Sequence, residues 1–341
     1  MPAPLSPVTS NRASTLALLF FCSLLCACNG AQSPSESLEV ATVGLHAGTL
    51  DATGTRAVVG SLYQGGSFWQ LDSRARKFNW NHNRDEFTTI IHTAFASNSD
   101  YALTADASAL VLWNTRTGEA LRYWSAPGEI LDAALGPMGN IALLGLSDHT
   151  AVLFDIQRGG ILYRLPSDNR VRSVDLSRNG RMAITGSEDA TATLWDTSTG
   201  KPLRKIKHND DVQLVRLSPD GNLALSVSKY DKALIWQTRD GKALGELPLN
   251  AEHLKRGMMF SAARFSDDNT KLLTGRPDQM VQLWRLPNLV EVERWRLPKR
   301  KRWKPGGAAV LDVSFDAQVA RFHAIASNGF IHTLASAPTA P

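Results

Sequence analysis

The sequence predicts an all-β protein, because six similar stretches of about forty residues are followed by a divergent seventh. Two markers recur with this period. A large, mostly aromatic residue ends the third strand of each unit, at Leu71, Trp113, Phe154, Trp195, Trp236, Trp284 and Leu334. An apolar residue precedes a tight turn, at Leu50, Phe95, Leu135, Leu176, Leu217, Phe265 and Phe315. A period of about 40 to 45 residues with four short strands predicts a seven-bladed β-propeller of four-stranded antiparallel blades.

The fourth unit, residues 171–203, shows how one blade is built. Residues 182–186 and 190–195 alternate apolar and polar side chains, which is typical of strands. Turn pairs such as Asn179-Gly180 separate the strands. A lone four-stranded sheet cannot bury both of its faces, so neighbouring sheets must stack, and seven of them close a ring.

The repeat resembles the WD-repeat family over about residues 40–334. The resemblance is strongest at Trp195-Asp196 and in the run Leu-Ser-Pro-Asp-Gly at residues 217–221. It implies structural roles for the third-strand markers Trp113, Trp195, Trp236 and Trp284 and for the acid Asp196. The resemblance also implies that the N-terminal strand closes the ring by completing the last blade, and residues 38–45 have a suitable length and place for it.

The hydrogen-bond network typical of the family is expected in few blades. Its histidine, which follows a glycine in the family, has a counterpart at the matching offset only in His208, after Lys207. The acid of the turn before the third strand is better kept, at Asp148, Asp189 and Asp278.

The first residues of the chain are predicted to be a targeting signal. Residues 16–27 read LALLFFCSLLCA, and Arg12 is the only charge before them. Twelve residues are too few to span a bilayer of about 30 Å, whereas a short apolar run behind a cation is typical of a secretory signal.

The end of this signal is more specific. Leu25-Cys26-Ala27-Cys28 resembles the lipobox of bacterial lipoproteins, which implies cleavage before Cys28 and acylation of its thiol and its new amine. The alternatives are an ordinary cleaved signal or a buried hydrophobic segment. Asn29 follows, and the absence of an Asp there favours the outer membrane, facing the periplasm. All three cysteines lie in this region, so a processed chain has no disulfide, cysteine zinc site or free thiol for catalysis.

These features predict four parts of the chain. A signal peptide covers residues 1–27, and the lipidated Cys28 begins a polar tether over residues 28–37. The propeller covers residues 38–336, and residues 337–341 form a disordered tail. With about ten residues of tether, the lipid and the first strand lie at most about 33 Å apart.

Basic character is concentrated in one segment. The formal net charge is +5, and residues 294–304, RWRLPKRKRWK, hold seven cations and no acid. This segment falls in one of two insertions, near residues 298–307; the other lies near residues 249–258 and also contains His253. Both lie between an outer strand and the next inner strand, so they should share one face of the ring. The predicted partner-binding residues are Lys299, Arg300, Lys301, Arg302, Trp303, Lys304, Lys255 and Arg256.

Cations interleaved with aromatic rings suit acidic proteins, phosphates or lipid headgroups. The alternative is a solvated loop in which Trp295 packs as strand core. Three further charges, Asp175, Arg216 and Arg264, each precede the apolar marker of their unit. They either mark a polar site in the channel or form structural pairs between blades, and the cost of burying an unpaired charge favours pairs.

Signatures of catalysis are weak. The eight histidines are scattered, and the sequence has no phosphate-binding glycine loop and no nucleophile elbow. We therefore expect no enzyme activity, no cofactor and no metal, but a lipid-anchored periplasmic scaffold for protein interaction or envelope assembly. Its expected partners are envelope proteins and, through the anchor, the membrane, but not nucleic acid. The alternative is a propeller hydrolase or lyase with its site in the central channel.

Overall fold

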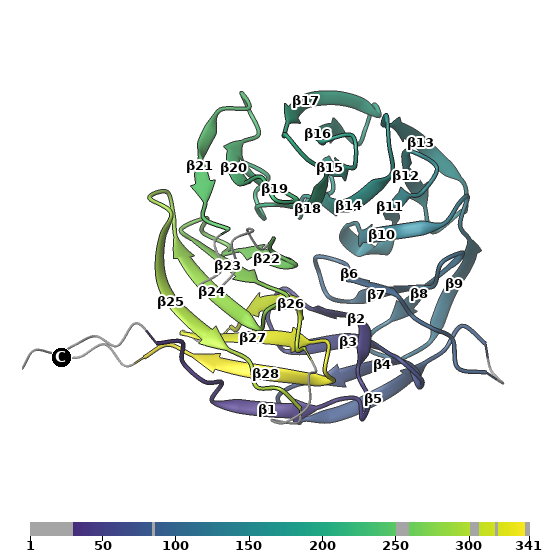
Figure 1. The fold of residues 1–341 in the computed structure, drawn as a ribbon. Helices are drawn as coiled ribbons and strands as arrows, with labels where there is room; N and C mark the ends of the chain where they lie inside the picture. The colour runs from purple at the N-terminus through teal and green to yellow at the C-terminus, as the bar shows by residue number, and fades with distance from the viewer. Residues whose placement is uncertain (1–29, 84–85, 250–258, 301–306, 318–319, 338–341) are drawn as a thin grey trace, which may run out of the picture. The chain divides into compact units, whose positions relative to one another are not determined.

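The computed structural model describes residues 30–83, 86–249, 259–300, 307–317 and 320–337. The chain divides into two compact units, residues 1–30 and residues 31–341. In the second unit, seven four-stranded sheets follow one another around a central channel (Figure 1), as predicted. Among the described residues, no helix is long and apolar enough to cross a membrane.

Within a blade we call the strands inner, second, third and outer, counted from the channel. Blade 1 consists of β2 (Leu45–Leu50), β3 (Arg56–Ser61), β4 (Gly65–Gln70) and β5 (Ala75–Trp80), and blade 2 consists of β6 (His92–Phe95), β7 (Tyr101–Ala105), β8 (Ala109–Asn114) and β9 (Ala120–Ser125). Blade 3 consists of β10 (Ile130–Leu135), β11 (Ile141–Leu146), β12 (Thr150–Asp155) and β13 (Ile161–Pro166). Blade 4 consists of β14 (Val171–Leu176), β15 (Met182–Ser187), β16 (Thr191–Asp196) and β17 (Lys201–Lys207). Blade 5 consists of β18 (Val212–Leu217), β19 (Leu223–Ser228), β20 (Ala233–Gln237) and β21 (Ala243–Leu247). Blade 6 consists of β22 (Ala262–Phe265), β23 (Lys271–Gly275), β24 (Met280–Arg285) and β25 (Val290–Arg296). Blade 7 consists of β26 (Val310–Phe315), β27 (Arg321–Ala326), β28 (Phe330–Ala335) and, as its outer strand, β1 (Glu36–Glu39).

The third-strand marker of blade 1 is Trp69, which corrects the prediction of Leu71. Trp69 pairs with Ala57, the second residue of β3, just as Trp195 pairs with Ala183, the second residue of β15. Leu71 lies beyond the strand. The reason for the difference is the long connection between β5 and β6, which moves Trp69 away from the regular period.

The other tryptophan markers have the predicted structural role. Each is buried, and its indole N–H donates to a hydroxyl on the second strand of its own blade at 2.8–3.2 Å; the pairs are Trp113 with Thr104, Trp195 with Thr185, Trp236 with Ser226 and Trp284 with Thr274. This bond satisfies the only polar atom of a side chain that otherwise fills the space between blades. Asp196 is also structural, because it accepts bonds from the N–H and the hydroxyl of Ser198 in the turn after β16. These two bonds lower the pKa of Asp196.

The N-terminal strand closes the ring, although its position differs from the predicted residues 38–45. β1 pairs with β28 from Glu36 opposite Thr333 to Glu39 opposite Phe330. Residues 40–44 cannot continue the strand, because they cross from the outer edge of blade 7 to the inner strand of blade 1. Val40 and Ala41 are buried on this path.

The predicted tether is shorter than expected, because the chain is already fixed at Gln32. The Gln32 N–H donates to the carbonyl of Arg294 at 2.9 Å, and the Arg296 N–H donates to the carbonyl of Gln32 at 2.8 Å. Gln32 thus adds a short parallel pairing to the outer edge of blade 6. The chain then passes to the outer edge of blade 7, so the folded unit begins before residue 38.

Arg300 holds the closed ring together, and its role in partner binding stays a prediction. Its guanidinium forms an ion pair with Glu39 at 2.7 Å and donates to the carbonyls of Asn328, at 2.9 Å, and of Ala41. It also lies over the ring of Phe330, with 4.7 Å to the centroid. All three guanidinium nitrogens are therefore occupied within the molecule.

Replacing Arg300 with Ala is expected to lower the free energy of unfolding by about 1–3 kcal/mol, because buried carbonyls lose a charged donor. Replacing the neighbouring Lys299, which is exposed and makes no bond to a described residue, should change it by less than about 0.5 kcal/mol. Urea unfolding of both variants measures the difference. Equal effects would show that Arg300 does not hold the ring.

Candidate functional site

The ring has two faces with different connections. The turns between second and third strands lie on the same face as the connections from outer strands to the next inner strands, and we call this the insertion face. The opposite face carries the remaining turns, and we call it the turn face. Both predicted insertions fall between an outer and an inner strand, namely between β21 and β22 and between β25 and β26, so the insertion face carries both of them.

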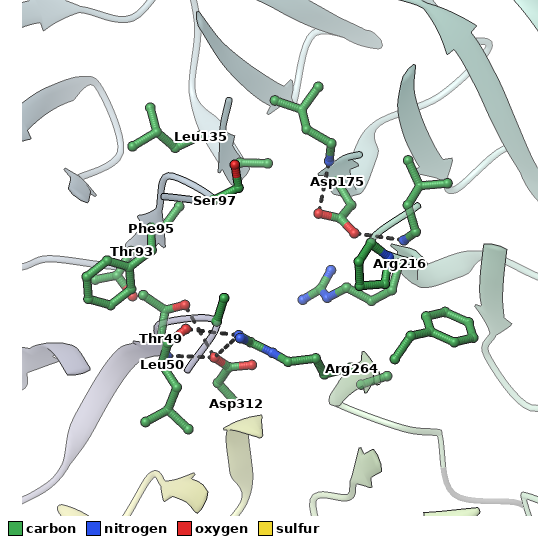
Figure 2. A pocket seen from close by; sticks show the side chains of 18 of the residues that line it. Thr49, Leu50, Thr93, Phe95, Ser97, Leu135, Asp175, Arg216, Arg264 and Asp312 are labelled. Atoms are coloured by element: carbon green, nitrogen blue, oxygen red, sulfur yellow. Dashed lines mark hydrogen bonds and ion pairs between the residues drawn. The ribbon is translucent and has the colours of Figure 1, made fainter. Parts of the chain in front are cut away.

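The central channel has a volume of about 930 Å³ and is lined by the seven inner strands. Inner strands are sheet edges, so part of their backbone has no ladder partner. Figure 2 shows how charged side chains from one blade meet the backbone of the next across this lining.

Three aspartates connect the inner strands of neighbouring blades by hydrogen bonds at these edges. Each carboxylate accepts a hydrogen bond from a backbone N–H of the following inner strand at 2.8–2.9 Å; the pairs are Asp132 with Val174, Asp175 with Leu217, and Asp312 with Leu50. Arg264 adds an ion pair to Asp312 at 3.1 Å and donates to the carbonyls of Leu50 and Asp51 at 2.9 Å. The prediction that Asp175 and Arg264 form structural contacts between blades is therefore confirmed.

Arg216 forms the third of these predicted contacts. It donates to its neighbouring carbonyl, Val215, and to the hydroxyl of Ser173 in the preceding blade at 3.4 Å. Burial raises the pKa of Asp175, while the nearby Arg216 and the two backbone N–H groups act in the opposite direction. Arg216 and Arg264 both reach into the channel from adjacent blades (Figure 2).

The turn-face end of the channel is bridged by side chains from alternate blades. Arg178, in the first turn of blade 4, forms an ion pair with Asp267 of blade 6. Its carbonyl accepts a hydrogen bond from the hydroxyl of Ser97 of blade 2 at 2.9 Å. These residues lie in turns separated by a whole blade, so the contacts cross the channel instead of following the ring.

Histidine networks occur in two blades. His208 lies 2.9 Å from the hydroxyl of Ser226 and 3.9 Å from Asp231, as predicted from its offset. His82 makes the same contacts in blade 2, with Thr104 at 2.9 Å and Asp106 at 3.1 Å. The prediction that only His208 occupies this place is wrong, because the long connection after β5 moves His82 away from the expected offset. Burial lowers the pKa of both rings, that of His208 to about 4.

Asp189 occupies the corresponding turn of blade 4. Its carboxylate accepts from the N–H and hydroxyl of Thr191 and from the hydroxyl of Ser167, which stands where the other two blades have histidine. The predicted Asp278 instead pairs with Arg276, and Asp148 accepts from Thr150. The network is thus complete in few blades, as expected.

An exposed apolar patch lies on the insertion face. Val43, Tyr63 and Phe87 have 55%, 71% and 68% of their surface exposed. They lie in three connections of this face, Val43 between β1 and β2, Tyr63 between β3 and β4, and Phe87 between β5 and β6, and the first two connections meet where Leu62 donates to the carbonyl of Gly44. We call these three residues the aromatic patch. Sequence reasoning missed it, since an aromatic residue in a turn shows no period and its exposure depends on the packing around it.

Several predicted site residues cannot be placed. Cys28, Lys255, Arg256, Lys301, Arg302, Trp303 and Lys304 lie outside the described residues. Of the predicted cations that are described, Lys299 is exposed on the insertion face, whereas Arg300 is used in ring closure. Trp295 is fully buried and packs against Phe322, which agrees with its interpretation as strand core. Among the described residues, no three His, Asp or Glu side chains are grouped so that they could hold a metal ion.

Comparison with known families adds one match. Residues 159–196 match the family described as WD domain, G-beta repeat. The matched segment covers the outer strand of blade 3 and the first three strands of blade 4, so the sequence repeat is offset by one strand from the blade. A search of curated proteins found no match. The matched repeat and the seven-bladed fold together support the WD-repeat propeller family.

Proposed function

We propose that this WD-type propeller is a lipid-anchored scaffold of the bacterial envelope that docks proteins on its insertion face. The observation that carries the proposal is the aromatic patch of Val43, Tyr63 and Phe87 on a rigid ring. Large exposed aromatic side chains on a preformed surface favour protein association, because their burial is favourable and little backbone order is lost.

The channel lining favours docking over the alternative of a propeller hydrolase or lyase. Four charged groups of the lining, Asp132, Asp175, Asp312 and Arg264, hold the backbone or side chains of neighbouring blades. Moving any of them to serve a substrate would break a contact between blades. A scaffold requires only that this ring stay rigid.

Docking is tested by photo-crosslinking in intact cells. A photoreactive amino acid at Tyr63 or Phe87 should capture envelope proteins, whereas the same group at Met138, equally exposed at 68% but on the turn face, should capture few. Replacing Tyr63 and Phe87 with Ser should then weaken binding of the captured partner about tenfold or more. Equal capture at Met138 would contradict docking on the insertion face.

The anchor is tested by replacing Cys28 with Ala. We expect the variant to escape acylation and to leave the membrane fraction, because a short apolar signal without the acylated cysteine provides no lasting anchor. Fractionation and mass spectrometry of the mature N-terminus measure both effects. A variant that is processed normally and remains on the membrane would remove the lipoprotein part of the proposal.

A further inference from the structure

The path by which the chain enters the propeller determines which part of the propeller lies nearest to the anchor at Cys28. Gln32 is held against β25 by two backbone hydrogen bonds and by its side-chain amide, which donates to Glu293 at 3.2 Å. Residues that follow it run to β1 on the outer edge of blade 7. The C-terminal end leaves beside it, where the Ala337 N–H donates to the same Glu293 carboxylate. Both ends of the described chain therefore meet the outer edge of blades 6 and 7.

The distance from this point to Cys28 is limited by covalent geometry. Four residue steps separate Cys28 from Gln32, and an extended chain spans about 14 Å over that length. The tether therefore keeps the outer edge of blades 6 and 7 close to a membrane attached at Cys28. Blade 3, on the far side of the ring, is not held there by the tether (Figure 1).

The acids of this edge are all engaged within the molecule. Glu36 pairs with Arg74, Glu39 with Arg300 and Glu291 with Arg294, while Glu293 accepts from Gln32 and Ala337. Three of these carboxylates are paired with an arginine, which offsets their charge toward an anionic surface, whereas the two donors to Glu293 are neutral.

Two cations of the same edge are free to meet such a surface. Arg296 ends β25, and Lys299 follows it; both side chains are exposed, and neither bonds to a described residue. Cations within a Debye length of anionic headgroups are attracted to them, and the attraction adds to that of a lipid chain.

We propose that the outer edge of blades 6 and 7, with Arg296 and Lys299, lies against the anionic phospholipid headgroups of the membrane. The ring then stands on its edge, and both its faces open sideways. This orientation keeps Tyr63 and Phe87 of the aromatic patch free for a protein partner, because they lie in connections of blades 1 and 2, away from the outer edge of blades 6 and 7. The inference rests on the proposed anchor at Cys28.

The orientation is tested with two matched labelling sites in the full chain. Val290 on β25 and Leu162 on β13 are both aliphatic residues of outer strands, 51% and 45% exposed. Val290→Cys and Leu162→Cys variants are purified from membranes, labelled with a fluorophore and reconstituted into vesicles that contain headgroup-spin-labelled lipid. We expect quenching at position 290 to be several times stronger than at position 162. Equal quenching at both positions would show that the ring tumbles on its tether and would overturn the inference.

The role of charge is tested in the same vesicles. Quenching at position 290 should fall when phosphatidylglycerol is replaced by phosphatidylcholine, and when Arg296 and Lys299 are both replaced by Gln. The matched control replaces Lys201 and Lys207, two exposed cations of β17, with Gln. This replacement should leave the quenching at position 290 unchanged. If quenching at position 290 depends neither on lipid charge nor on the replacement of Arg296 and Lys299, the proposed headgroup contact is overturned. If the protein leaves the vesicles altogether, the anchor itself is refuted, which vesicle flotation detects separately.

Discussion

Deleting β1, residues 36–39, is expected to lower the free energy of unfolding by several kcal/mol. The strand supplies the outer edge of blade 7 and brings Arg74 and Arg300 into contact with Glu36 and Glu39. Its loss removes a ladder of backbone hydrogen bonds, each worth about 1 kcal/mol, and exposes the edge of β28. The two ends of the ring would then be joined by side-chain packing between β2 and β26 and by hydrogen bonds such as those of Asp312 with the Leu50 N–H and of the Leu45 N–H with the carbonyl of Ser327.

Urea and thermal unfolding of the deletion variant measure this loss. Glu36→Gln is the control, because it removes only an ion pair that is about half exposed and should cost at most about 1 kcal/mol. An unchanged unfolding midpoint after deletion would mean that the ring closes without this strand. Increased aggregation of the deletion variant would agree with an unpaired strand edge.

Acidification is expected to destabilise the propeller from about pH 6.5 downward. Burial lowers the pKa of His208 and of His332 from 6.5 to about 4, so both rings are neutral in the folded protein. The unfolded chain binds more protons in this window, and stability therefore falls with pH until the folded groups also titrate. Each ring contributes at most about 3 kcal/mol to this loss. Nothing is lost from this source at neutral pH, where both states carry neutral histidine.

Substitution separates the two rings from other titrating groups. His208→Gln and His332→Gln should each reduce the dependence of unfolding free energy on pH below 6.5, although both variants start from lower stability. His46→Gln, at an exposed position of β2, is the control and should leave the dependence unchanged. Urea unfolding in a series of buffers from neutral to acidic pH gives the comparison. An identical slope in wild type and both buried-histidine variants would contradict the expectation.

The loss of stability in acid and the closure of the ring by β1 are connected through His332. The hydroxyl of Ser37 on β1 lies 2.8 Å from Nδ1 of His332 on β28, and burial is the cause of the low pKa of this ring. Protonating His332 places a charge next to the closing pair of strands. Loss of β1 pairing is therefore expected among the earliest local changes in acid, and hydrogen exchange of β1 amides would detect it.

The sequence by itself was enough to predict the number and build of the blades. The alternation of apolar residues and the turn pairs determine structure within one unit. Their period can therefore be recognised in the sequence without knowledge of the contacts between units. The apolar markers, four of the tryptophan markers and the charges before the apolar markers all followed from that period. Asp175, Arg216 and Arg264 were placed correctly between blades, because an unpaired charge in such a position is too costly.

Tertiary structure decided what depends on residues far apart in the chain. Trp69 and His82 were missed because the long connection between β5 and β6 breaks the period without disturbing the packing. β1 takes its register from β28, nearly three hundred residues away, so its limits could not be read from residues 36–45 alone. Arg300 appeared in the sequence as one cation among many, and only the closed ring brings it to Glu39 and Ala41. The aromatic patch likewise depends on the topology of the fold, which places the connections that carry Val43, Tyr63 and Phe87 on one face.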